Sequence, residues 1–266
     1  MTVRTMVTSV MNGTLRSGLA AVALFALCAH SARADDVRVL AAGAAKHALE
    51  RIAPAFERET GHRLLAAYDT VGAQRDRVLQ QDAGAAADLV ILSDAALRSL
   101  AQAGKLQSSP PLAIGQVVVA LAVPAGATLP DLSTPQALRT ALLHATSIAY
   151  ADPARGATAG SHFAKVMDAL DLREALQGRV TVLPFGVDVI TGVAQGRFGL
   201  GVSQSSEVLQ HEGVRYAGAL PAPHALATGY AAALASDSAA ARQLLEFLGR
   251  PPAQAQWHAS GFVAPQ

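Results

Sequence analysis

The chain alternates short, uninterrupted apolar runs with segments in which apolar residues recur at helical spacing. The first pattern is typical of buried strands and the second of amphipathic helices. A strand is predicted over residues 37–42, and a helix follows over 45–60. Gly61 is expected to end this helix, because glycine adopts the left-handed conformation of a helix C-cap most easily.

The same alternation continues to the end of the chain. Further strands are predicted over 62–68, 87–92, 115–123, 147–150, 180–183, 199–204 and 229–234, and further helices over 73–82, 93–104, 138–144, 160–170, 189–195 and 239–248, with a segment of unassigned type over 206–212. Strands that alternate with helices indicate an α/β protein with parallel sheets. The strand over 115–123 is long enough to cross between two lobes. We therefore predict one lobe made of 35–117 plus 228–266 and a second made of 118–227.

The first 34 residues have the pattern of a cleavable secretory signal. Two arginines precede the apolar run 18–29, and Ala32 and Ala34 occupy the positions that signal peptidase reads. The apolar run is shorter than the roughly 20 residues that span a bilayer. We therefore expect residues 1–34 to be removed, a periplasmic location and no membrane anchor. A lipid on Cys28 is the alternative.

Composition and motif content exclude several classes of function. The 266 residues are 51% hydrophobic and 15% charged, which predicts a globular protein with a sizeable core. A net charge of +1 argues against a nucleic-acid binder, and a single cysteine excludes an internal disulfide framework and cysteine-rich zinc sites. The chain contains no Gly-x-Ser-x-Gly, His-Glu-x-x-His or Walker motif, and its histidines are scattered. We expect a monomer with no cofactor, no metal and no nucleic-acid partner.

Loops that follow predicted strands and open predicted helices are the candidate binding site. They are residues 42–45, 69–73, 152–161 and 184–189. In open α/β sheets, ligands bind at the carboxyl ends of the strands, where helix N-termini present unpaired N–H groups to anions. The loops therefore predict a cleft for a small anionic ligand. The alternative is that their small residues serve only tight turns.

Short motifs along the chain also carry a family resemblance. They are found at 39–49, 55–61, 83–91, 151–153, 159–165, 199–202 and 261–262. Their combination resembles the periplasmic molybdate-binding proteins of ABC importers. The resemblance implies a type II periplasmic-binding-protein fold, with two α/β lobes that close on a ligand in the cleft between them, and an ABC permease as partner.

The positions expected to touch the ligand depart from the molybdate-binding pattern. Ala44 and Val71 stand where that family has serines, with Thr70 beside the second, and Gln204 stands where it has a tyrosine. A buried oxyanion that loses its donors is costly. The longer third loop carries Arg155, which suits a planar carboxylate through bidentate hydrogen bonds. We therefore predict a di- or tricarboxylate ligand rather than molybdate, with Arg155 as its principal cation.

A second resemblance raises the possibility of catalysis. The loop 152–162 is similar to that of aconitate isomerases, which are periplasmic enzymes of this fold. That resemblance implies allylic proton transfer between trans- and cis-aconitate, with one base and several cations. The charged candidates near the loops are Lys46, His47, Asp69, Arg75, Arg155 and His162. Each has a plain alternative as a surface, capping or packing residue, so no catalytic base is assigned.

The predicted ligand-binding positions follow from these loops and from the resemblance. They are Gly43, Ala44, Ala45, Lys46, Thr70, Val71, Gly72, Arg155, Thr158, Ala159, Gly160, Ser161, Val189 and Gln204.

Overall fold

A computed structural model describes residues 34–80 and 87–264, which belong to one compact unit. The predicted signal peptide and its cysteine lie outside the described residues, except for Ala34. The end of the helix predicted over 73–82 also falls outside them. Among the described helices, none has the length and apolar character needed to cross a membrane.

The described strands join in the order β2-β1-β3-β9-β4-β7-β5-β6, with β8 attached to β4. Their bounds are β1 (Asp36–Ala42), β2 (Arg63–Asp69), β3 (Leu89–Ser93), β4 (Leu112–Pro124), β5 (Ile148–Ala151), β6 (Val180–Leu183), β7 (Leu200–Gln204), β8 (Val214–Ala219) and β9 (Ala227–Leu234). The β1–β2, β1–β3, β5–β6 and β5–β7 pairs are parallel. Every pair that includes β4 or β9 is antiparallel.

Helices fill most connections between these strands. They are η1 (Gly43–Ala45), α2 (Lys46–Thr60), α3 (Val71–Gln80), α4 (Asp94–Gln102), α5 (Pro135–His144), η2 (Pro153–Arg155), α6 (Thr158–Ala169), α7 (Gly186–Ala194), α8 (Ser205–Val208), α9 (Ala239–Leu248) and α10 (Pro251–Ala259). The predicted helix end is confirmed at Gly61, whose φ is 75° and whose N–H donates to the carbonyl of Glu57.

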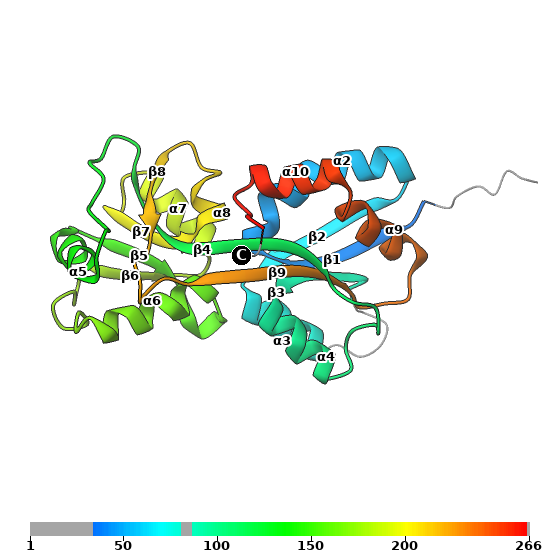
Figure 1. The fold of residues 1–266 in the computed structure, drawn as a ribbon, viewed down its shortest axis with the longest axis horizontal. Coiled ribbons are helices and arrows are strands. Elements are labelled where there is room, and N and C mark those ends of the chain that lie inside the picture. The colour runs from blue at the N-terminus through cyan, green and yellow to red at the C-terminus, as the bar shows by residue number, and fades with distance from the viewer. Residues whose placement is uncertain (1–33, 81–86, 265–266) are drawn as a thin grey trace, which may run out of the picture. The chain divides into compact units, whose positions relative to one another are not determined.

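These elements form two α/β lobes, as predicted. Strand β4 passes through both: Leu112–Val118 pairs with β9, and Val119–Pro124 pairs with β7 and β8. Figure 1 shows β4 and β9 running side by side, with α2, α9 and α10 near one end of the pair and α5, α6 and α7 near the other. Pairing across β4 thus makes a continuous connection between the lobes.

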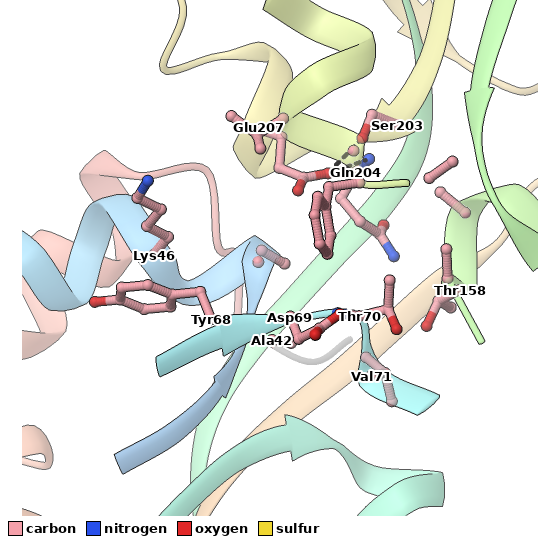
Figure 2. A pocket seen from close by; sticks show the side chains of 18 of the residues that line it. Ala42, Lys46, Tyr68, Asp69, Thr70, Val71, Thr158, Ser203, Gln204 and Glu207 are labelled. Carbon is pink, nitrogen blue, oxygen red and sulfur yellow. Dashed lines mark hydrogen bonds between the residues drawn. The ribbon is translucent and has the colours of Figure 1, made fainter. Parts of the chain in front are cut away.

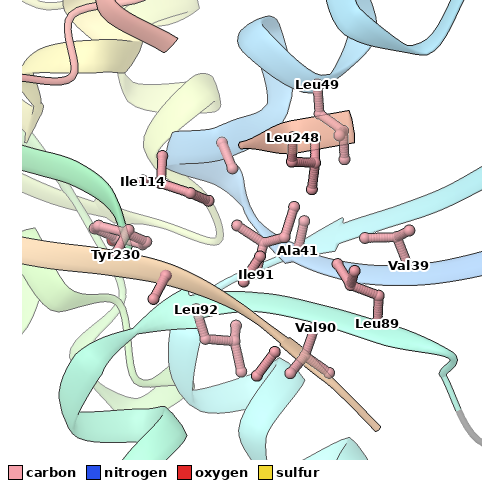
Figure 3. Packing of buried hydrophobic residues seen from close by; sticks show 14 of the residues in the cluster. Val39, Ala41, Leu49, Leu89, Val90, Ile91, Leu92, Ile114, Tyr230 and Leu248 are labelled. Carbon is pink, nitrogen blue, oxygen red and sulfur yellow. The ribbon is translucent and has the colours of Figure 1, made fainter. Parts of the chain in front are cut away.

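Each lobe has its own apolar core. In the first, β1 and β3 are buried between α2, α9 and α10 on one face and α3 and α4 on the other, and Figure 3 shows Leu49 and Leu248 packed over these strands. In the second, Phe163 and Leu138 are fully buried against β5 and β7. Separate cores leave the junction between the lobes free of a shared hydrophobic interior.

The hydrophobic pattern missed one strand and one α-helix. Strand β8 pairs with β4 through a bulge between Leu121 and Ala122, and its mixed sequence gives no strand signal. Helix α10 opens with Pro251 and Pro252, which read as a helix stop although proline is favoured in the first helical turn. Trp257 on α10 is buried and meets the ring of Phe262 edge-on at 5.5 Å.

Candidate ligand cleft

A cavity of about 170 Å³ lies where the carboxyl ends of strands from both lobes meet. Ala42 and Asp69 end β1 and β2 of the first lobe, and Ala151 and Gln204 end β5 and β7 of the second. Tyr230 of β9 completes the floor. A cavity on the order of 150 Å³ holds a benzene-sized molecule. The space therefore fits a small organic molecule.

Helix N-termini from both lobes open onto this cavity. Gly43, Val71, Thr158 and Gly186 begin η1, α3, α6 and α7, and all four line it. Helices η1, α6 and α7 have no side-chain cap, so their first N–H groups have no side-chain acceptor. Unpaired N–H groups and the helix dipoles favour an anion in this position.

Neutral polar side chains face the same space. Gln204 is only 4% exposed, and neither atom of its amide has a hydrogen bond of acceptable geometry. Tyr230 is buried beside Thr158 and Gln204, and burial raises the pKa of its hydroxyl well above the ordinary value. Figure 2 shows the Gln204 amide directed towards Thr158. A buried amide without partners is costly, so Gln204 is prepared to bind a ligand.

Lys46 supplies the only lysine or arginine side chain among the described residues that line the cavity. Its ammonium lies 5.8 Å from the ring centre of Tyr68 and 3.9 Å from a carboxyl oxygen of Glu50. The neighbouring His47 also lines the cavity, and burial lowers the pKa of its imidazole, which is therefore neutral at pH 7. The positive charge in the cavity thus comes from Lys46 and the helix N-termini.

The carboxyl group of Glu207 is the unexpected member of the site. Ser203 Oγ donates to its Oε2, and the N–H of Gln204 donates to the same oxygen at 3.4 Å. The residue is partly accessible, and it lines the cavity (Figure 2). Desolvation among the surrounding protein atoms nevertheless raises the pKa of Glu207 above its ordinary value of 4.5. The nearby Asp188 acts in the same direction, while the bonds from Ser203 and Gln204 oppose it.

Apolar side chains cover the rest of the wall. Val71, Phe185 and Val187 line the cavity together with small alanines. An oxyanion such as molybdate presents only oxygen atoms, which such side chains cannot satisfy. A carbon skeleton that carries carboxylates would match both the polar and the apolar parts of the cavity wall.

The lobes touch across the mouth of the cleft. Arg155 Nη2 lies 3.1 Å from Asp69 Oδ1, and its guanidinium stacks 4.8 Å from the ring centre of Phe185. Thr70 Oγ1 donates to the carbonyl of Arg155, and the N–H of Gly72 donates to the carbonyl of Gly156 at 3.1 Å. The structure is therefore in a closed arrangement.

The structure brings together part of the predicted site. The predicted positions that line the cavity are Gly43, Ala44, Lys46, Thr70, Val71, Thr158, Ala159 and Gln204. Those outside the lining are Ala45, Gly72, Arg155, Gly160, Ser161 and Val189. Val189 is fully buried in an apolar cluster, and Gly160 packs against the carbonyl of Ala151.

The other charged candidates have local partners. Asp69 lines the cavity, but its carboxylate accepts from Arg155 and from the N–H of Thr70. Arg75 pairs with Asp76, and the ring of His162 hydrogen-bonds the carbonyl of His224.

Sequence reasoning missed several lining residues, which are Tyr68, Ser203, Glu207 and Tyr230. Glu207 follows Gln204 by three residues, the spacing of a capping box, and its carboxyl group accepts from the N–H of Gln204 as in that motif. The spacing would have indicated a helix start at the end of a strand. It would not have shown that the carboxyl group faces a cavity.

Comparisons with known proteins agree with this architecture. The family model described as bacterial extracellular solute-binding protein matches residues 37–263. An aconitate isomerase from Pseudomonas sp. is 30% identical over 216 residues, which cover 79% of this chain and 80% of the relative.

Two solved structures show the same fold. The periplasmic molybdate-binding protein of Azotobacter vinelandii superposes with a TM-score of 0.70 at 22% identity, covering 86% of this chain and 100% of its own. The sulfate-binding protein of Mycobacterium tuberculosis gives a TM-score of 0.64 at 18% identity, covering 86% of each chain.

Proposed function

Because the chain belongs to the bacterial extracellular solute-binding proteins, we propose that its cleft binds a small di- or tricarboxylate in the periplasm. The observation that carries this proposal is the mixed character of the cavity. Uncapped helix N-termini and Lys46 offer charge to carboxylates, while Val71, Phe185 and Val187 offer apolar contact to the carbon atoms between them. Gln204 provides an unpaired amide for one more carboxylate oxygen.

The same features argue against a tetrahedral oxyanion. Ala44 and Val71 line the cavity at the positions where hydroxyl donors were expected from the resemblance to molybdate-binding proteins. A thermal-shift panel of molybdate, tungstate, sulfate, citrate and both aconitates tests the proposal. A ligand at 100 times its Kd adds about 2.7 kcal/mol, which raises Tm by about 5–10 °C for a chain of this size. A shift with molybdate and none with the organic acids would overturn the proposal.

As a receptor, the protein would deliver its ligand to an ABC permease by opening and closing its lobes. The closed contact between Asp69 and Arg155 supports such a motion, because both side chains lie at the mouth and neither belongs to a shared core. Hinge closure around a ligand is a common device of two-lobed proteins.

Isomerisation of aconitate is the second candidate function. It is favoured by the relative named aconitate isomerase and by the presence of Glu207 in the cavity. An ionised acidic side chain repels an anionic ligand, whereas proton transfer can use a carboxylate as its general base. Incubation of the purified protein with trans-aconitate, followed by chromatographic measurement of cis-aconitate, separates turnover from binding.

A further inference from the structure

We propose that Glu207 is the catalytic residue that carries the proton between two carbon atoms of an unsaturated tricarboxylate held in the cleft. This proposal rests on the isomerase function proposed above. The sequence alone assigned no catalytic base, and Glu207 lies outside the four candidate loops.

The hydrogen bonds of the carboxyl group leave one oxygen for the ligand. Ser203 and the N–H of Gln204 both donate to Oε2, which fixes the orientation of the group. Oε1 has no such donor and lies against Gly43, where a Cβ atom would be only 3.0 Å away. The absence of a side chain at Gly43 therefore lets Oε1 approach the loop where helix α2 begins and an anion would lie.

Two of the other titratable groups at the cavity, Asp69 and Tyr230, are poorly suited to be the base. Asp69 is occupied by Arg155 and by the N–H of Thr70. Burial raises the pKa of the Tyr230 hydroxyl, which remains a neutral donor. His47 has a lowered pKa and is the alternative base that the experiment must test.

A single carboxyl group can both remove the proton from trans-aconitate and return it. The Glu207 carboxylate takes a proton from the methylene carbon of trans-aconitate, and the C–H electron pair becomes the new C=C bond. The electron pair of the old C=C bond then takes the same proton back from the carboxylic acid at the former vinyl carbon. Lys46 and the helix N-termini would stabilise the charge that spreads onto the ligand's carboxylates between these two events.

Glu207→Gln tests the assignment, because it preserves the shape of the side chain and removes its basicity. We expect kcat/KM for trans-aconitate to fall by about 10²–10⁴-fold, the usual contribution of a general base. The Kd for trans-aconitate, measured by calorimetry, should change by less than about tenfold. Glu212→Gln is the matched control, since Glu212 is exposed and lies outside the cavity.

Ser203→Ala provides a second variant with a different readout. Its hydroxyl donates to Glu207 and favours the ionised carboxylate, so its loss should move the acid limb of the kcat/KM profile to higher pH. The titratable groups that act on Glu207 are Asp188 on α7 and Tyr230 on β9, and Lys46 and His47 on α2 line the same cavity. None of these is altered in the variant.

The outcomes separate the two proposals. If the wild-type protein binds trans-aconitate without converting it, the isomerase function is overturned and the role of Glu207 falls with it. If the wild-type protein is active and Glu207→Gln retains that activity, only the role of Glu207 is overturned. Loss of activity in His47→Asn together with activity in Glu207→Gln would assign the base to His47.

Discussion

Gln204 ends β7, Glu207 lies on the helix α8 that follows, and both side chains line the cavity. The amide of Gln204 lacks partners, and the carboxyl of Glu207 has donors on one oxygen only. Both groups are stabilised by a ligand that brings complementary atoms. Two polar side chains with free hydrogen-bonding capacity thus lie three positions apart in the sequence.

Protonation of Glu207 should make stability depend on pH. Because the pKa of Glu207 is raised in the folded state, the folded protein keeps a proton above pH 4.5 that the unfolded chain releases. The stabilisation that this bound proton gives to the folded state is complete below pH 4.5 and is lost as pH rises through the folded pKa of Glu207. The free energy of unfolding falls by about 1.4 kcal/mol for each unit by which the folded pKa exceeds the unfolded one. Urea unfolding at pH 5 and pH 8 should show a smaller fall in stability for Glu207→Gln than for wild type. Equal falls in both proteins would contradict this account.

The ammonium of Lys46 should contribute more to binding than the guanidinium of Arg155. Lys46 lines the cavity, whereas Arg155 is exposed, lies outside the lining and is paired with Asp69. We expect Lys46→Ala to weaken tricarboxylate binding by about 10–100-fold, or roughly 1.4–2.8 kcal/mol, and Arg155→Ala to weaken it by less than tenfold. Titration calorimetry measures both, with the exposed Lys165→Ala as control. The reverse order of effects would restore Arg155 as the principal cation.

The start of helix α6 shows how a loop motif can serve packing rather than binding. A Cβ atom on Gly160 would overlap the carbonyl of Ala151, because α6 lies directly against the end of β5 in the same lobe. Gly160→Ala should therefore lower the free energy of unfolding by about 3 kcal/mol, as overpacking in a tight site does. Gly126→Ala is the control, since nothing lies within 4 Å of its added Cβ. Denaturant melts of equal midpoint for the two variants would show that α6 can shift.

At the scale of elements, hydrophobic periodicity was enough to place most strands and helices. Apolar runs such as 89–92 and 117–123 became β3 and part of β4 because burial on both faces leaves no room for polar alternation. The pattern failed at β8, which pairs with only one neighbour, and at α10, whose opening prolines look like a stop. Both missed elements depend on tertiary contacts that a local pattern does not contain.

At the scale of the whole molecule, the closed contact depends on the absence of side chains at Gly72 and Gly156. A Cβ on Gly72 would be 2.6 Å from the Cα of Gly156 and 3.0 Å from the carbonyl oxygen of Arg155. Because these glycines belong to different lobes, opening the cleft relieves the overlap without disturbing either core. Gly72→Ala should therefore affect closure of the cleft, whereas Gly160→Ala should affect the stability of the fold.

We expect Gly72→Ala to keep wild-type stability without ligand and to lose at least tenfold in ligand affinity, because closure is blocked. Small-angle X-ray scattering with saturating ligand should give a larger radius of gyration for this variant than for wild type. Gly126→Ala should match wild type in both measurements. A destabilised Gly72→Ala protein with unchanged affinity would show that the contact serves folding rather than closure.

The sequence predicted which loops would converge but not which of their side chains would face the ligand. Thr70, Thr158 and Gln204 line the cavity as expected, because loops at strand ends meet in this fold. Arg155 was predicted to bind the ligand for the same reason, and in this closed structure its guanidinium pairs with Asp69 of the opposite lobe. A contact between residues so far apart in sequence follows only from the relative placement of the lobes.

Calorimetric titration of the purified protein with trans-aconitate, citrate and molybdate under one set of conditions tests the central claim most directly. The cavity's apolar walls, its uncapped helix N-termini and Lys46 predict a micromolar or tighter Kd for at least one tricarboxylate. Molybdate should bind at least 100-fold more weakly, a difference of about 2.8 kcal/mol. Micromolar binding of molybdate, with no heat from either organic acid, would contradict the account.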